Sequence, residues 1–175
     1  MNDATLSPLE RFLATLDIVH RKARHLAWSH RRLFAQRIDL DWVDSLDTNP
    51  ERAEQLEAFI SRFGRLQDTI GDKLLPRWLL ALAERPASQI ESLNRAEKLG
   101  VIESVDRWLE ARQLRNRLIH EYMTDSSDFL ASLTLADNYS YLLLRTYENF
   151  RRDAVSRIGV PPNEVPPPLD TISSY

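Results

Sequence analysis

The spacing of the apolar residues constrains this chain more than any other feature. Between Leu9 and Phe34, apolar side chains recur every three or four positions, which is the period of an amphipathic helix. The same period returns in residues 56–74 and 129–150, and no segment alternates apolar and polar residues as a half-buried strand does. The sequence therefore predicts an all-α fold, an up-and-down bundle of about five helices.

Proline and turn residues set the expected boundaries of the first two helices. The first helix runs from about Leu9 to Phe34, and residues 39–49, rich in acidic and turn residues, are predicted to be a loop. Pro50 suits the first turn of the second helix. Pro76 must kink or interrupt that helix, because proline has no N–H to donate.

Capping signals set the boundaries of the later helices. Ser88 followed by Glu91 is the pattern of a capping box, and it opens a short helix that Gly100 can close in a left-handed conformation. Asp125 or Ser126 is expected to cap the last helix.

The end of the chain has a composition that cannot form helix. After Gly159 it reads V-P-P-N-E-V-P-P-P-L-D, and such proline runs favour an extended, polyproline-like backbone. We therefore expect one helical domain over residues 1–158 and an extended or disordered Pro-rich tail over residues 159–175.

Two absences narrow the class of protein. The chain has no cysteine, so neither a disulfide framework nor a thiolate metal site can form. Residues 1–7 lack the pattern of a secretory signal, and no apolar run approaches the ~20 residues of a membrane span. We therefore expect a cytoplasmic protein that does not enter a membrane.

The distribution of charge is more informative than the net charge of −3. Residues 20–37 contain six basic side chains and no acid, whereas residues 38–60 contain seven acids and one arginine. One interpretation is an RNA-facing arm beside a surface for a basic partner. The other is a pair of solvated helix faces of opposite sign that bind each other.

Arginines interrupt the apolar stripe of the predicted fourth helix, about residues 103–123. Val105, Trp108, Ile119 and Tyr122 follow the helical period, and Arg112 and Arg115 occupy the same spacing between them. The spacing predicts that both guanidinium groups face the core side. Each then needs a partner, either an anion in a cleft or an acid such as Asp68 or Asp72 of the second helix.

The string R-N-R-L-I-H-E-Y begins at Arg115. Arginine, a polar residue, three variable positions and histidine are matched by Arg115, Asn116 and His120, and this pattern resembles the signature of the HEPN superfamily. With Tyr122 two positions after the histidine, the longer pattern is similar to that of HepT-like toxins. The resemblance covers the helical body, about residues 6–157.

The resemblance implies a homodimeric toxin of a type VII-like toxin–antitoxin pair. It would be a metal-independent endoribonuclease without a cofactor, in which two copies of the fourth helix meet at the dimer axis. The RNA substrate, a tRNA or an mRNA, is cleaved by attack of its 2′-hydroxyl. The resemblance also implies a minimal nucleotidyltransferase antitoxin that neutralises the toxin by transferring AMP to Tyr122.

The residue types suit that chemistry, because the reaction needs a proton acceptor and cations that stabilise the charged phosphorane. In this interpretation Arg115 binds and polarises the phosphate, Asn116 orients it, and His120 moves protons. Arg112 and Arg117 are candidate contacts to RNA phosphates.

Other functional patterns are weaker. Arg24 and His30 also have the arginine-to-histidine spacing, but they project about 120° apart on a helix. His20, His25 and His30 step by about 140° each, so they cannot converge on one metal.

Two alternatives to a ribonuclease remain open. One is a non-catalytic helical subunit that binds a minimal nucleotidyltransferase or its substrate, and the other is a plain helical scaffold. The four tryptophans, Trp28, Trp42, Trp78 and Trp108, are predicted to be core or dimer contacts rather than platforms for base stacking.

Overall fold

Helices form the whole framework of the protein. The computed structural model describes residues 5–122 and 124–170, and no β-strand occurs among them, which confirms the all-α prediction. The helices are α1 (Pro8–Phe34), α2 (Leu40–Asp44), α3 (Pro50–Thr69), α4 (Leu75–Ala81), α5 (Gln89–Lys98), α6 (Val105–Glu121) and α7 (Ser126–Asp153), with shorter helical turns at Ser45–Asp47, Ile70–Leu74, Ala154–Ile158 and Pro162–Glu164.

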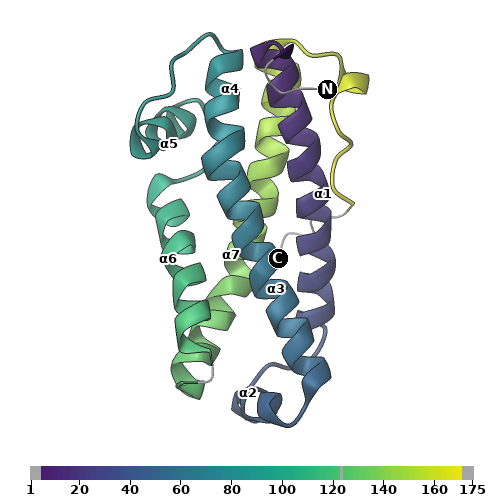
Figure 1. The fold of residues 1–175 in the computed structure, drawn as a ribbon, viewed down its shortest axis with the longest axis vertical. Helices are drawn as coiled ribbons and strands as arrows, with labels where there is room; N and C mark the ends of the chain where they lie inside the picture. Colours follow the sequence, from purple (N-terminus) through teal and green to yellow (C-terminus); the bar gives the residue numbers. More distant parts are fainter. Residues whose placement is uncertain (1–4, 123, 171–175) are drawn as a thin grey trace.

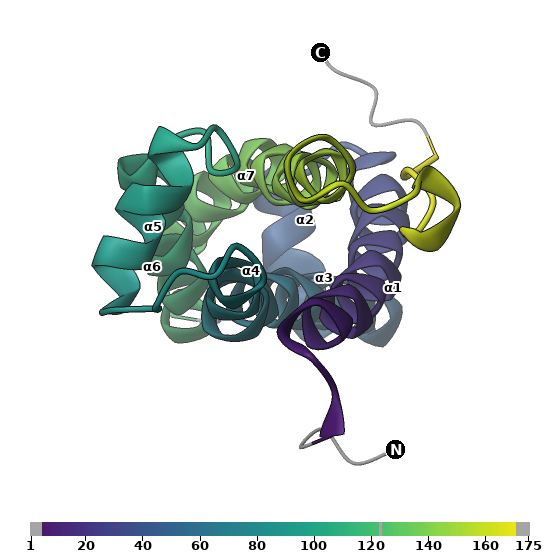
Figure 2. The same ribbon diagram turned by 90° about the horizontal axis from the view of Figure 1, so that it is seen from above.

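The long helices run along one axis as a bundle. Figure 1 shows α1, the continuous rod of α3 and α4, α6 and α7 side by side, with α2 and α5 at opposite ends. In the view along that axis, α6 and α1 lie on opposite sides of the bundle, and α3 and α7 lie between them (Figure 2). Helix α6 therefore packs against both α3 and α7.

The predicted helix boundaries agree with the observed capping. The Ser88 side chain accepts a hydrogen bond from the backbone N–H of Glu91, and the Glu91 carboxylate accepts one from the backbone N–H of Ser88, so the capping box is confirmed. Gly100 has a φ of 77°, the left-handed conformation expected after α5. Of the two candidate caps for α7, Asp125 is the one used. The helix predicted over about residues 103–123 is observed over Val105–Glu121, and position 123 lies outside the described residues.

Pro76 interrupts the regular α-helix, as predicted, but the rod continues. The turn Ile70–Leu74 is π-helical, and the N–H of Leu75 donates to the carbonyl of Ile70, five residues earlier. The wider turn relieves the clash between a proline ring and the carbonyl of the residue four positions before it.

The prediction of a loop over residues 39–49 is wrong. Helix α2 and the turn Ser45–Asp47 occupy most of that segment. Asp39 caps α2 by accepting from the N–H of Trp42 at 2.9 Å, and the Trp42 ring is buried. Five residues are too few to show a helical period, so a buried aromatic side chain and a cap decide the structure.

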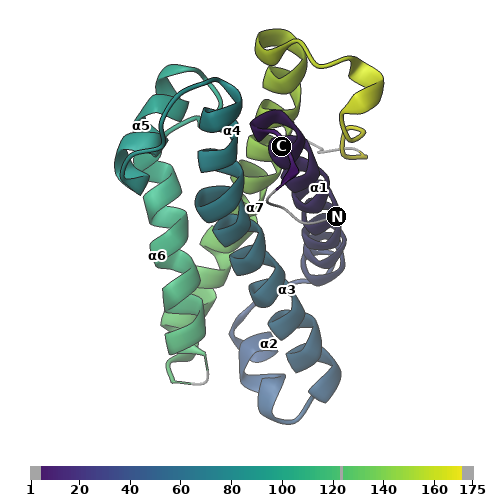
Figure 3. The same ribbon diagram turned by 45° about the horizontal axis from the view of Figure 1, so that its top comes forward.

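The Pro-rich segment extends from the end of α7 toward α1 (Figure 3). Its Val160, Val165 and Leu169 side chains are buried and belong to the hydrophobic core. The hydroxyl of Tyr147 donates to the carbonyl of Pro167 at 2.8 Å, which ties the segment to α7. Residues 159–170 therefore pack against the bundle, whereas residues 171–175 of the predicted tail lie outside the described residues.

Within the described parts of the chain, no helix is long and apolar enough to cross a membrane.

A buried polar contact links α4 to the end of α7. The Trp78 ring is fully buried, and its Nε1–H donates to Oδ2 of Asp153 at 2.7 Å. The other carboxylate oxygen of Asp153 accepts from Nε of Arg157 at 2.7 Å. Asp153 therefore supplies the acceptor that a buried indole N–H requires.

We expect Asp153→Ala to lower the free energy of unfolding by about 1–3 kcal/mol, because the Trp78 N–H loses its acceptor inside the core. Asp153→Asn keeps an acceptor oxygen and should cost less. Urea unfolding followed by circular dichroism measures both variants. Equal losses for the alanine and asparagine variants would show that the acceptor is not what stabilises this contact.

Candidate functional site

One face of α6 is buried and fixes the rotation of the helix. Its buried side chains follow a helical period and are Val105, Trp108, Ala111, Leu114 and Leu118. The predicted stripe is wrong at Arg112 and at Ile119, which are both exposed, whereas Tyr122 packs against the core as predicted. Gln67 of α3 donates to the carbonyl of Trp108 at 3.1 Å, and Ser132 of α7 donates to the carboxylate of Glu121 at 2.7 Å, so both neighbours bind α6.

Arg115 points toward α3. Its Nη2 lies 3.2 Å from Oδ2 of Asp68, and both side chains are partly exposed. The side chain passes over Gly64, where an added Cβ would lie 2.8 Å from Nε of Arg115. The close approach of α3 to this arginine therefore depends on the absence of a side chain at Gly64.

Arg112 does not face the core, which corrects the prediction for this residue. It is exposed and donates to the side-chain oxygen of Gln89, and Gln89 in turn donates to Asp72 at 2.9 Å. Asp72, one of the two acids predicted as partners, is thus linked to Arg112 through Gln89. This chain of contacts joins α5, α6 and the π-helical turn.

A groove of about 360 Å³ lies between α3 and α6. From α6 it is lined by Arg115, Leu118, Ile119 and Tyr122, and from α3 by Glu57, Ile60, Ser61, Gly64 and Arg65. Its floor and walls are mostly apolar, and its charges are two arginines and one glutamate. We call it the α3–α6 groove.

Asn116, Arg117 and His120 lie outside the α3–α6 groove. All three are exposed, and within residues 5–122 and 124–170 no side-chain hydrogen bond or ion pair is found for any of them. Asn116 and His120 are four residues apart and project within about 40° of each other. They form a polar patch on the side of α6 that faces neither α3 nor α7.

Tyr122 is the residue at the C-terminal cap of α6 and is half-buried. Its ring packs edge to face on Phe129, with ring centres 5.6 Å apart. Burial raises the pKa of the Tyr122 phenol above its ordinary value, and the carboxylates of Glu57 and Asp47 raise it further. The ring is thus a packing residue, and its hydroxyl lies at the groove beside an acid.

The motif residues therefore divide between two directions. Arg115 and Tyr122 project within about 20° of each other into the groove, whereas His120 projects about 140° from Arg115. One copy of α6 cannot place His120 and Arg115 on the same phosphate. A site that uses both needs a second copy of the helix.

The remaining histidines do not share a site. His20 is buried against Tyr147, His30 is buried with its Nε2 2.6 Å from Oδ1 of Asp137, and His25 is exposed. In the described parts of the chain, no three His, Asp or Glu side chains are grouped closely enough to hold a metal ion.

Sequence reasoning missed the α3 side of the groove. Glu57, Gly64 and Arg65 belong to the candidate site, but they precede the motif by about 50 residues and share no spacing with it. Gly64 in the middle of a helix is the one local signal, since an interior glycine weakens a helix and often marks a close approach.

We expect Glu57→Gln to lower the Tyr122 pKa, because the phenolate then forms without a neighbouring negative charge. The pKa should stay above its ordinary value, since burial is the larger cause. Titration of ring-labelled tyrosine by NMR measures the shift, with Glu54→Gln as a control for a charge on α3 outside the α3–α6 groove. A Tyr122 pKa that is unchanged in Glu57→Gln would contradict this assignment.

No family model, curated protein or solved structure significantly matches the chain. The HEPN resemblance therefore depends on the motif of α6 and its surroundings alone.

Proposed function

We propose that the chain is a homodimeric, metal-independent endoribonuclease that acts in the cytoplasm as the toxin of a toxin–antitoxin pair. The observation that supports this most is the state of His120 and Asn116. They lie together on an exposed face of α6 and have no hydrogen bond or ion pair within the described residues, as groups that act on an external substrate require.

The proposed reaction is an internal transfer within the RNA. His120 accepts the proton of a 2′-hydroxyl, the oxygen attacks the adjacent phosphorus, and the 5′-oxygen leaves as the protonated His120 donates that proton to it. The products are a 2′,3′-cyclic phosphate and a 5′-hydroxyl. Arg115 binds the phosphate oxygens, whose negative charge grows in the transition state, and Asn116 orients the phosphate.

A second subunit completes this proposed site. Because Arg115 and His120 of one α6 diverge, the histidine of one copy and the arginine of the other are the pair that can meet across a two-fold axis. Ile119 supports this arrangement, since its apolar side chain is 51% exposed between the two groups. Packing of Ile119 against its counterpart would remove that surface from water.

The α3–α6 groove suggests how the toxin is neutralised. AMP transferred to the Tyr122 hydroxyl places a phosphodiester in a groove that also holds Arg65 and Arg115. Charge-assisted hydrogen bonds from these arginines would hold the modified side chain and occupy the phosphate-binding position. Glu57 opposes this, so the modification depends on the two cations outweighing one acid.

Purified protein should cleave RNA in buffer that contains EDTA. His120→Ala and Arg115→Ala should each reduce the rate by about 10²-fold or more, which is the lower end of acid–base and oxyanion contributions. Gln113→Ala is the matched control, because Gln113 is exposed on the same side of α6 but outside the motif. Full activity in His120→Ala, or activity that EDTA abolishes and magnesium restores, would disprove the assigned chemistry.

Subunit mixing tests whether sites are shared. When His120→Ala and Arg115→Ala proteins are mixed and allowed to exchange subunits, activity should return, because one of the two sites in each mixed dimer has both groups. A monomer by light scattering, or no recovery after proven exchange, would show that the site is not built across the dimer axis.

The alternative, a non-catalytic subunit that binds a nucleotidyltransferase, gives a different result. The protein would then bind its partner through the exposed face of α6 and cut no RNA under any of these conditions.

Co-expression with the cognate nucleotidyltransferase should add the mass of one or more AMP units, and peptide mapping should place the modification at Tyr122. Tyr122→Phe should remain toxic and escape neutralisation, because only the acceptor oxygen is lost. Tyr139→Phe, which removes another partly exposed phenol, should be neutralised like the wild type. Neutralisation of Tyr122→Phe at the wild-type level would mean that inhibition comes from binding alone.

A further inference from the structure

A line of basic side chains follows the contact between α1 and α3. Arg21, Lys22, His25 and Arg32 come from α1, and Arg62 and Arg65 come from α3; we call this surface the α1–α3 seam. Two hollows lie along it, of about 500 Å³ around Trp28 and about 410 Å³ around His25, and Arg62 lines both.

Most of the cations on the seam form no ion pair within the described residues. Among the ion pairs of the described residues, Arg21 with Asp17 is the one that involves a seam residue. Lys22 donates to the hydroxyl of Thr69. The pKa of Lys22 is lowered mainly by burial and to a lesser extent by the positive charges of Lys73 and Arg65. The interpretation that the basic and acidic segments bind each other is not supported, since Arg37 with Asp39 is the one ion pair between them within the described residues.

Trp28 is the apolar centre of the seam. It is 51% exposed, whereas Trp42, Trp78 and Trp108 are each at most 3% exposed. Three of the four tryptophans are therefore core residues as predicted, and Trp28 is not. The guanidinium carbons of Arg32 and Arg62 lie 5.3 and 5.8 Å from its ring centre.

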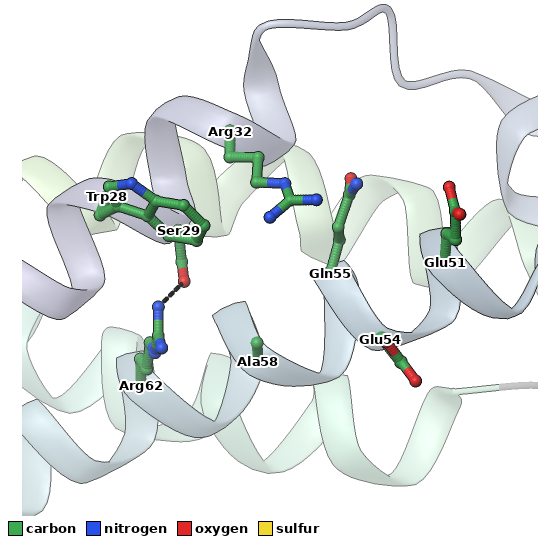
Figure 4. A pocket seen from close by; sticks show the side chains of 8 residues that line it. All are labelled: Trp28, Ser29, Arg32, Glu51, Glu54, Gln55, Ala58 and Arg62. Carbon is green, nitrogen blue, oxygen red and sulfur yellow. Dashed lines mark hydrogen bonds between the residues drawn. The ribbon is translucent and has the colours of Figure 1, made fainter.

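Arg62 is held in place. It donates to the hydroxyl of Ser29 at 2.6 Å and to the carbonyl of His25, so its position beside the Trp28 ring is fixed before any ligand binds (Figure 4). Glu51 and Glu54 lie away from Trp28 at the other end of the hollow, and they limit the positive surface there (Figure 4).

The seam leads to the α3–α6 groove. Arg65 lines both the hollow around His25 and that groove, where Arg115 and Tyr122 lie. Because Arg62 lines the first two hollows and Arg65 the last two, the three hollows are neighbours in a series from Trp28 to Arg115. Its members are an exposed aromatic ring followed by cations, which is the pattern of a surface that binds single-stranded nucleic acid.

We propose that the α1–α3 seam binds single-stranded RNA, with an unpaired base stacked on Trp28 and the following phosphates bound by Arg62 and Arg65. Its role as a substrate track rests on the ribonuclease function proposed above. Duplex RNA fits less well, because its bases are paired and cannot stack on a side chain. A second copy of the chain fits less well too, because like charges would face each other across the seam.

Tryptophan fluorescence gives a direct test, because Trp28 is the exposed one of the four. Short oligouridylate should quench the emission of full-length His120→Ala protein, which is used so that the RNA stays intact. Trp28→Phe should remove the quenching and retain binding by fluorescence anisotropy of labelled RNA. Trp28→Ala should weaken binding by at least about fivefold, the lower limit for loss of one stacked base.

The salt dependence separates stacking from phosphate contacts. Arg65→Gln should reduce the slope of log affinity against log salt by about 0.7, the value for one phosphate contact to a single strand. Trp28→Ala should leave the slope unchanged. Arg31→Gln is the matched control, since it removes one exposed arginine of α1 that lines neither hollow.

Several outcomes would overturn the proposal. One is an equal change in the salt slope for Arg65→Gln and Arg31→Gln, and another is duplex RNA that binds as tightly as the single strand. A third is a Trp28→Ala protein that changes from dimer to monomer while its RNA affinity stays the same. RNA that binds as expected but is not cut by the wild type leaves the seam standing and removes the ribonuclease function. If RNA is cut but its KM is unaffected by Trp28→Ala and Arg65→Gln, the ribonuclease function stands and the role of the seam is disproved.

Discussion

The burial of one face of α6 between α3 and α7 is the constraint on which the candidate site depends. Trp108, Leu114 and Leu118 are each at most 2% exposed, and burying such a side chain stabilises the fold by roughly 1.5–3 kcal/mol. A rotation of α6 would expose them, so the direction of every other side chain on the helix is fixed. Arg115 is thereby directed at α3, and Asn116 and His120 at solvent.

The sequence was sufficient for the longer helices but not for the short helix α2 or for the rotation of α6. Two series obey the same helical period from Val105 and Trp108. One passes through Arg112, Arg115 and Ile119, and the other passes through three apolar residues, Ala111, Leu114 and Leu118. Spacing alone does not distinguish them. The uniformly apolar series is the buried one, and the cost of burying an unpaired guanidinium explains why.

Contacts between distant segments were largely beyond prediction, although Asp68, one of the two acids proposed as partners, does pair with Arg115. The period of α1 predicts a helix with an apolar face, but Trp28 is exposed because α3 places Arg62, and not an apolar side chain, beside it. The same limit applies to Gly64, whose role appears only when Arg115, about 50 residues later, lies across it. Helix capping was predictable at Ser88 and Asp125, because a cap depends on neighbours within three residues.

The pairing of Arg115 with Asp68 is compatible with a phosphate-binding role. A fully buried pair would hold the guanidinium too strongly, since separating it leaves an uncompensated charge in the core. This pair is 33% and 45% exposed, and such exposed pairs contribute only about 0–1 kcal/mol. A phosphate can therefore displace the carboxylate at little cost, while the space over Gly64 keeps the long side chain extended across α3. In the proposed ribonuclease, Asp68 would orient the arginine in the absence of RNA and release it to a phosphate that accepts two hydrogen bonds.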